Sequence, residues 1–326
     1  MPGWQQALKE AFTELDELLD YLELDKNHLE SSRQSIQQFG LRVPQGFASL
    51  MQKGDPQDPL LLQVLPAAIE LQSQAGFERN PVGDLEAEAT PGLLHKYSGR
   101  ALVIATGACA VHCRYCFRRH YPYDVGVASP RQWSTVLDYL QADRSISEVI
   151  LSGGDPLMLS DVKLADWFTH LSAIPHLKRL RIHTRLPVVL PERVTPQLLG
   201  LLASARLPTV VVVHINHPRE LSPAVAEALT QLRETKTTLL NQSVLLKGIN
   251  DSVEVLTTLS EGLFEAGVLP YYLHMLDRVE GAAHFEVNEE TARMIYRGLL
   301  ARLPGYLVPK LVREIAGEGS KTPLMT

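Results

Sequence analysis

The sequence predicts an α/β fold built on a parallel sheet, which is either doubly wound or curled into an incomplete barrel. From residue 100 onward, six short β-rich runs alternate with helical patterns. Runs such as Val210–Val213 are apolar throughout, which is typical of parallel strands that are covered on both faces. All three cysteines of the chain directly follow the first of these strands. Because functional loops follow the strands of β/α barrels, this position favours the barrel.

Local patterns set the expected elements of this region. Strands are expected at 101–105, 148–151, 179–183, 209–215, 239–246 and 270–275. Helices are expected at about 130–141, 160–173, 195–204, 222–233, 251–266 and 288–302. The repeating order of strand and helix predicts parallel pairing between successive strands.

Residues 1–92 precede this pattern and are predicted to form a helical region followed by a linker. Apolar residues at three- and four-residue steps predict a first helix that ends near Leu24, namely Leu8, Phe12, Leu15, Leu18 and Leu19. A break at 25–27 separates it from a second helix at 28–39, and residues 77–92 are rich in Pro, Gly and polar residues. Residues 93–305 are then the barrel, and 306–326 form a C-terminal segment.

Composition excludes several classes of protein. Hydrophobic residues make up 45% of the chain and charged residues 21%, as in ordinary globular proteins. The net charge of −6 argues against binding to nucleic acid or to an acidic membrane. We find no apolar run of the roughly 20 residues that span a bilayer, and the acidic N-terminus is unlike a signal peptide. With no cysteine left for disulfides, a cytoplasmic location is expected.

The three cysteines, Cys109, Cys113 and Cys116, have the spacing C-x3-C-x2-C. Three thiolates are one short of the four that close a structural zinc or iron–sulfur site, so one metal position would remain open for chemistry. Two other interpretations are a zinc site completed by His112 or His120, and three unrelated thiols.

Polar residues at the ends of the following strands are further candidates. After the second strand, Ser152, Gly153, Gly154 and Asp155 form either a backbone cradle with an acceptor for an ammonium group or a turn that caps the next helix. His214 follows the fourth strand as a structural residue or a ligand contact. Gln242 lies in an apolar strand and needs a polar partner. Asp277 either meets a cationic group or caps a turn.

Lys321 lies near the end of the chain in the Gly-rich segment Glu314–Pro323. The spacing of a phosphate-binding loop is missing. From the residues alone we expect a mobile tail. The alternative is a lysine whose amine forms a Schiff base with a carbonyl cofactor.

The cysteine motif resembles the cluster-binding loop of radical S-adenosylmethionine (radical SAM) enzymes, and the chain from about residue 90 resembles lysine 2,3-aminomutases. The resemblance rests on segments at 95–100, 109–119, 151–157, 214–220, 241–251, 269–273 and 317–323. It implies a partial (β/α)6 barrel with an N-terminal helical region and a C-terminal tail that binds pyridoxal 5′-phosphate (PLP). It also implies a [4Fe–4S] cluster and S-adenosylmethionine as cofactors.

The resemblance further implies a role for each candidate residue. The cysteines hold three irons of the cluster, and Lys321 is the PLP lysine, with Lys96, Tyr97, Arg100 and Gln242 around that cofactor. S-adenosylmethionine would meet Ser152, Gly153, Gly154, Asp155, His214 and Gln242. Arg118 would bind the substrate carboxylate, which suits the paired donors of a guanidinium. Asp277 and Glu314 would bind the distal ammonium of lysine, although clostridial members have Asp at the second position.

Departures from the longer family members refine the prediction. At Ser252 those proteins carry a cysteine of an intersubunit zinc site, so we expect no zinc here. The compact chain resembles the enterobacterial form, which implies free L-lysine as substrate and (R)-β-lysine as product. It further implies a one-electron donor such as flavodoxin and a link to elongation factor P and its lysyl ligase. The alternatives are an aminomutase for glutamate or arginine, and a radical SAM enzyme that does not use PLP.

Overall fold

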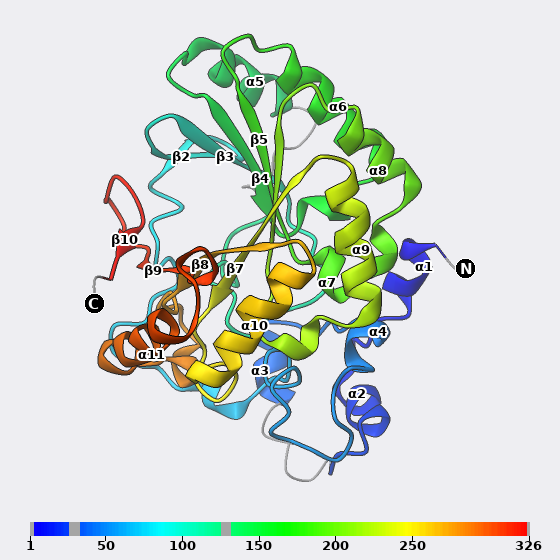
Figure 1. Cartoon of the computed structure of the whole chain (residues 1–326), viewed down its shortest axis with the longest axis vertical. Helices are drawn as coiled ribbons and strands as arrows, with labels where there is room; N and C mark the ends of the chain where they lie inside the picture. The colour runs from blue at the N-terminus through cyan, green and yellow to red at the C-terminus, as the bar shows by residue number, and fades with distance from the viewer. Residues whose placement is uncertain (1–2, 26–32, 125–131, 325–326) are drawn as a thin grey trace.

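The structure is a computed structural model that describes residues 3–25, 33–124 and 132–324. Ten strands form one sheet in the order β1 to β10. Strands β3 to β9 are parallel, and the antiparallel strands β1, β2 and β10 extend the two edges. Over the described residues the strand order is linear, so the curved sheet in Figure 1 is an open barrel. The predicted partial barrel is confirmed.

The strands are β1 (Glu88–Thr90), β2 (Leu93–Tyr97), β3 (Arg100–Thr106), β4 (Glu148–Gly153), β5 (Arg179–Thr184), β6 (Thr209–Val213), β7 (Thr238–Val244), β8 (Leu269–His274), β9 (Lys310–Arg313) and β10 (Thr322–Pro323). The six predicted strands are present as β3 to β8. The seventh parallel strand, β9, was not predicted. The sheet crosses both predicted segment boundaries, because β1 precedes residue 93 and β9 and β10 follow residue 305.

The α-helices are α1 (Trp4–Lys9), α2 (Leu15–Tyr21), α3 (Arg33–Gln38), α4 (Gln45–Ala48), α5 (Trp133–Ala142), α6 (Asp161–Ser172), α7 (Leu186–Val189), α8 (Pro196–Ala203), α9 (Pro223–Glu234), α10 (Val253–Glu265) and α11 (Glu289–Arg302). Short 3-10 segments are η2 (Ala68–Leu71), η3 (Pro156–Met158), η4 (Pro191–Arg193), η5 (Pro218–Glu220), η6 (Ala283–Phe285) and η7 (Gly305–Leu307). The six predicted barrel helices are α5, α6, α8, α9, α10 and α11, and they follow the outside of the curved sheet (Figure 1). The first two positions of the helix predicted at 130–141 lie outside the described residues.

Several barrel helices begin at a side chain that caps them. A hydroxyl or amide oxygen accepts a hydrogen bond from the backbone N–H three residues on, which satisfies one of the free donors of the first turn. These capping residues are Ser160, Thr195, Ser222, Ser252 and Asn288. Caps therefore define where these five helices start after their strands.

Alternation along the parallel strands separates the core from the barrel interior. One row of paired residues packs against the helices and is almost fully buried: Val103, Leu151, Ile182, Val211 and Leu239. Their neighbours Leu102, Ile150 and Arg181 point to the other face and line an internal cavity. The apolar runs thus place side chains both against the helices and in the barrel interior, as expected for a parallel sheet covered on both faces.

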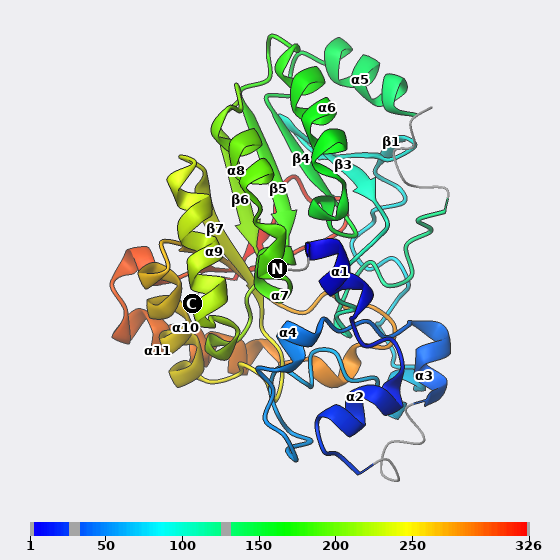
Figure 2. The same cartoon turned by 90° about the vertical axis from the view of Figure 1, so that its right-hand side faces the viewer.

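The N-terminal helices lie together at one end of the strands (Figure 2). The single helix expected up to Leu24 is wrong, because the chain forms α1 and α2 with a break at residues 10–14. In this break Phe12 pairs with Val43 as a β-bridge, with Phe12 N–H donating to Val43 O at 2.8 Å. Phe12 is buried by this bridge, so the tertiary contact, and not the helical spacing of the apolar residues, decides the local structure. Part of the second predicted helix, at 28–39, lies outside the described residues, and α3 forms its end.

Candidate active site

A cavity of about 390 Å³ opens inside the barrel and collects every predicted site residue. Its walls come from the cysteine loop, from the ends of the parallel strands and from the C-terminal segment. The predicted residues that line it are Lys96, Tyr97, Arg100, Cys109, Cys113, Cys116, Arg118, Ser152, Gly153, Gly154, Asp155, His214, Gln242, Asp277, Glu314 and Lys321. Positions more than 200 residues apart in sequence therefore face one space.

The cysteine loop is held by the N-terminal region. The N–H of His112 donates to Arg42 O at 3.0 Å, and the N–H of Arg114 donates to Gln63 O at 2.8 Å. In addition, the Arg42 guanidinium donates to Cys109 O at 3.3 Å. These bonds fix the loop path without using the thiols, and all three cysteines line the cavity.

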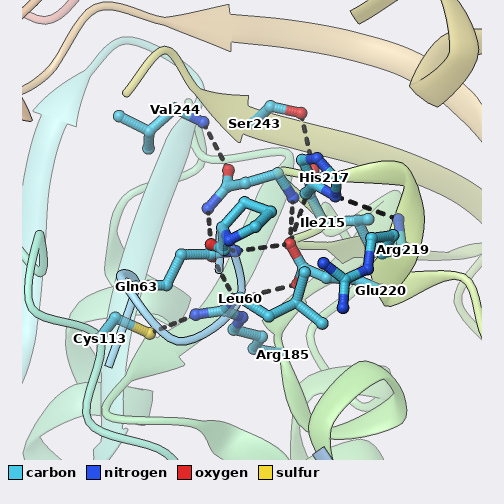
Figure 3. A network of polar contacts seen from close by, with 12 residues as sticks. Leu60, Gln63, Cys113, Arg185, Ile215, His217, Arg219, Glu220, Ser243 and Val244 are labelled. Carbon is cyan, nitrogen blue, oxygen red and sulfur yellow. Dashed lines mark hydrogen bonds and ion pairs between the residues drawn. The ribbon is translucent and has the colours of Figure 1, made fainter. Parts of the chain in front are cut away.

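Behind the loop lies a set of hydrogen-bonded residues that we call the Arg185 network: the buried Gln63, Arg185, Asn216 and Glu220, and the half-buried Cys113. Figure 3 shows Gln63, Cys113, Arg185 and Glu220 of this set. Arg185 directly follows β5, and its Nη1 donates to the Cys113 sulfur at 2.8 Å. Its Nη2 donates to Gln63 Oε1 at 2.6 Å and to Glu220 Oε2 at 2.9 Å. The Asn216 amide donates to Gln63 Oε1 at 3.0 Å. The network joins the cysteine loop to the N-terminal region and to the end of β6.

The turn after β4 packs directly on the start of the cysteine loop. Gly154 N–H donates to Thr106 O at 2.7 Å, and a Cβ at residue 154 would lie 2.4 Å from Ala108 O. Gly153 has a φ of +116°, which only glycine adopts readily. The two glycines are thus required for this close approach.

Asp155 is buried and its carboxylate is used inside the fold. It accepts from the N–H of Leu157, as the cap of η3, and from the N–H of Arg185 at 2.7 Å. The Thr184 hydroxyl also donates to it. Burial raises the pKa of Asp155 to about 6, against the lowering effect of these donors. The capping role considered from sequence is present, and Asp155 also holds the backbone of Arg185.

On the other side of the cavity a chain of ion pairs forms what we call the Asp84 network: Asp84, Lys96, Arg118, Glu314 and Lys321. Arg118 Nε lies 2.6 Å from Asp84 Oδ2, and Lys96 Nζ lies 2.5 Å from Asp84 Oδ1. Lys96 also contacts Glu314 at 3.0 Å, and Glu314 accepts from Lys321. Candidate residues for both ends of an amino-acid substrate are therefore linked by charge.

Opposite effects set the protonation of the acids in this region. Burial alone would raise the pKa of Glu314, but the ammonium groups of Lys321 and Lys96 lower it to about 2. The pKa of Asp277 is instead raised to about 7, by burial and by the nearby charge of Glu314. The two candidate acids for the distal ammonium thus differ: Glu314 is firmly ionised, and Asp277 titrates near neutral pH.

His214 and Gln242 form a polar pair at the ends of β6 and β7, with Gln242 Nε2 2.9 Å from His214 Nε2. Burial lowers the pKa of His214 to about 3, so the ring is neutral and has a lone pair to share. The polar partner required by the sequence position of Gln242 is therefore His214.

Comparison with known proteins agrees with this arrangement. Residues 103–256 match the model of the radical SAM superfamily. An L-lysine 2,3-aminomutase of Haemophilus influenzae is 51% identical, over 98% of this chain and 95% of that protein. The L-lysine 2,3-aminomutase of Escherichia coli is 50% identical, over 98% of this chain and 94% of that protein. The L-lysine 2,3-aminomutase of Clostridium subterminale is 34% identical, over 99% of this chain and 77% of that protein. The chain belongs to the lysine 2,3-aminomutase family. The suspected resemblance is confirmed.

Membership in the lysine 2,3-aminomutase family implies an iron–sulfur cluster, and the three thiols fit one. Burial raises the pKa of Cys109, helped by the charge of Cys116, and burial with the charge of Cys113 raises that of Cys116 to about 11. Crowded, buried thiols ionise only next to strong positive charge, which the irons of a cluster supply. In the described part of the chain no three His, Cys, Asp or Glu side chains gather around one point as for a single ion. A cluster does not need this, because each thiolate binds a different iron.

The family's PLP also finds suitable side chains. The Lys321 amine faces the cavity, and Arg100 lies over the Tyr97 ring at 4.5 Å from its centroid. An arginine suits a phosphate group, and an aromatic ring suits the face of a pyridine. Lys96, predicted for the same cofactor, also lines the cavity and forms ion pairs with Asp84 and Glu314.

Two residues of the site were missed from sequence. Asp84 lies in the predicted linker, where surrounding polar residues concealed a carboxylate that is only 2% exposed. Arg185 comes just after the third predicted strand, so the rule that strand ends carry function applied to it as well.

In the described ranges no helix has the length and apolar character to cross a membrane.

Proposed function

We propose that this protein is an L-lysine 2,3-aminomutase, an isomerase that moves the α-amino group of free L-lysine to C3 and gives β-lysine. The observation that carries the proposal is the convergence of three groups on one cavity: the three thiols, the Lys321 amine and the carboxylates of Asp277 and Glu314. The 50% identity to curated lysine 2,3-aminomutases over nearly the whole chain supports the same reaction.

The cofactor roles are assigned residue by residue. Cys109, Cys113 and Cys116 hold three irons, and Lys321 holds PLP, with Arg100, Tyr97 and Lys96 at its phosphate and ring. When bound, the cluster with S-adenosylmethionine supplies a carbon radical that removes hydrogen, and PLP carries the migrating nitrogen. The residues at S-adenosylmethionine are Ser152, Gly153, Gly154, Asp155, His214 and Gln242.

The substrate is held through its charges. Arg118 is fixed by Asp84 on its Nε side, so that its remaining N–H groups can meet a carboxylate. Asp277 and Glu314 complement the distal ammonium of lysine. Fixing both ends of the substrate positions C3 and C2, and a site inside the barrel limits the access of water and oxygen to reactive carbon.

The charge of the distal site separates the competing substrates. Two carboxylates repel the side chain of glutamate, which disfavours a glutamate aminomutase. Arginine carries a suitable charge, so it is the closer competitor. A radical SAM enzyme without PLP would make no use of Lys321.

The decisive experiment is anaerobic reconstitution with iron, sulfide and PLP, followed by S-adenosylmethionine, reductant and L-lysine. We expect β-lysine, with the R isomer after chiral derivatisation, and no product from glutamate. Cleavage of S-adenosylmethionine without β-lysine would refute the lysine assignment. β-Arginine formed faster than β-lysine would transfer the assignment to arginine.

We further propose that the β-lysine serves the modification of elongation factor P by its lysyl ligase, in the cytoplasm, with flavodoxin as electron donor. The support is the higher identity to the Escherichia coli relative, 50% against 34% for the clostridial one. Mass spectrometry of elongation factor P from a strain lacking this protein tests the link. An unchanged β-lysyl modification would exclude it.

A further inference from the structure

We propose that Arg185 is a positioning residue that raises the reduction potential of the iron–sulfur cluster through its hydrogen bond to the Cys113 sulfur. The inference rests on the proposed function, because it assumes that Cys113 is a cluster ligand. Arg185 is cationic and nearly buried, and it donates to that sulfur at 2.8 Å (Figure 3).

The direction of the effect follows from charge. Reduction adds one electron to the cluster and makes its sulfurs more negative. A hydrogen bond from a cation stabilises the reduced form more than the oxidised form, and hydrogen bonds to sulfur are among the factors that set cluster potentials. Screening by water is weak at this buried position. Removal of the guanidinium should therefore make the cluster harder to reduce.

The surroundings hold Arg185 in this one geometry. Glu220 and Gln63 are fully buried and accept from its Nη2, while Asp155 accepts from its backbone N–H. Glu220 is itself fixed, because its Oε1 accepts from the N–H groups of Asn216 and His217. The charge on Arg185 is thus aimed at the sulfur by groups from the N-terminal region and from the ends of two strands. Such an arrangement of partners is typical of residues that orient metal ligands.

A redox titration of the reconstituted protein tests the proposal. Wild type, Arg185→Met and the control Arg193→Met are loaded with iron and sulfide alone, and the reduced cluster is followed by electron paramagnetic resonance. Arg193 is a matched control because it is also fully buried, but it bonds to Leu157 O and Asp161 and does not line the cavity.

At a fixed ambient potential we expect the ratio of reduced to oxidised cluster in Arg185→Met to be at least tenfold below wild type. For a one-electron couple a tenfold ratio corresponds to a potential about 59 mV more negative. The Arg193→Met ratio should stay within twofold of wild type.

An Arg185→Met protein with full iron content and a wild-type titration overturns the proposal. If Arg185→Met does not retain iron, Arg185→Gln is titrated instead, since it removes the charge but keeps an amide donor. A ratio within twofold of wild type in that variant also overturns the proposal. Failure of the proposed function gives different results. A wild-type protein that binds no [4Fe–4S] cluster refutes both the proposed function and the role of Arg185. A shifted potential in Arg185→Met without β-lysine formation by wild type refutes only the proposed function.

Discussion

The two polar networks of the cavity differ in how their charges are satisfied. In the Arg185 network the ion pair of Arg185 and Glu220 is buried, with side chains 6% and 0% exposed, and neutral amides fill the remaining positions. In the Asp84 network the cations Lys96 and Lys321 are 17% and 20% exposed and share acids with each other. One network is closed and the other is open to the cavity.

This difference indicates a division of labour. A closed network holds a geometry, because most of its buried donors already have acceptors, with Arg185 Nε as an exception, and exchange would leave further buried groups unpaired. An open network of shared charges can exchange partners when a charged ligand enters. Asp277, whose pKa is about 7, lies on the open side. We therefore expect mutations in the Asp84 network to affect ligands and mutations in the Arg185 network to affect the fold and the cluster.

The largest expected effect is at Lys321. Lys321→Ala removes the only nitrogen proposed to anchor PLP covalently, so we expect loss of PLP absorbance and a fall in β-lysine formation of about 1,000-fold or more. Absorbance of the purified protein and turnover with L-lysine measure the two effects. Lys310→Ala is the control, because Lys310 lies exposed on β9 of the same hairpin. Retained PLP absorbance in Lys321→Ala would contradict the assignment.

The second effect concerns the closed network. Gln63 Oε1 accepts from Arg185 and Asn216, and its Nε2 donates to Glu220 at 3.1 Å. Gln63→Leu takes one partner from each of these buried groups, which keep others, so we expect a loss of roughly 1–3 kcal/mol in the free energy of unfolding. Denaturant titration of the cluster-free protein measures it.

The matched control for this change is Gln57→Leu, an exposed glutamine of the same segment. A Gln63→Leu protein as stable as Gln57→Leu would show that the Arg185 network is not a closed structural unit.

The third predicted effect is that of a mutation at Asp84, in the open network. Asp84→Asn removes the charge between Arg118 and Lys96, so Arg118 loses the partner that orients it. We expect the KM for lysine to rise about 10- to 100-fold, which corresponds to roughly 1.4–2.8 kcal/mol of binding free energy, with a smaller effect on kcat. Steady-state kinetics of the loaded enzyme test this. Glu86→Gln, an exposed acid two residues away, should behave as wild type, and an equal KM for both variants would refute the role of Asp84.

The two networks also show which features of this molecule are predictable from its sequence. The six β/α units and the candidates at strand ends were predictable, because strand periodicity and short motifs at strand ends are local signals. Lys321 was expected in a mobile tail from the residues alone, and only the family resemblance assigned it to the site. Asp84 was not predictable, because its burial depends on Lys96 and Arg118, which lie in other elements. The break between α1 and α2 was missed for the same reason, since the Phe12 bridge to Val43 is a contact between distant positions. What sequence patterns omit here is the partners that distant segments supply, including those that interrupt the first helix and that add β9 to the sheet.

The smallest expected effect, at Asp277, is a change in pH dependence. Burial and the charge of Glu314 raise the pKa of Asp277 to about 7, so the carboxyl is mostly protonated at pH 6 and mostly ionised at pH 8. Only the ionised form attracts the distal ammonium of lysine. Lysine affinity should therefore rise with pH across this window, by up to about tenfold because the ionised fraction changes tenfold per pH unit below the pKa.

Asp277→Asn separates this titration from that of the other acids. Glu314, whose pKa is about 2, remains ionised throughout the window, so it contributes a constant attraction. In the variant we expect the lysine Kd, measured by calorimetry without S-adenosylmethionine, to be weaker than in wild type at pH 8 and nearly constant from pH 6 to 8. A variant that keeps the wild-type pH profile would mean that another group titrates in the open network. That group, and not Asp277, would then be the exchangeable charge that distinguishes the Asp84 network from the Arg185 network.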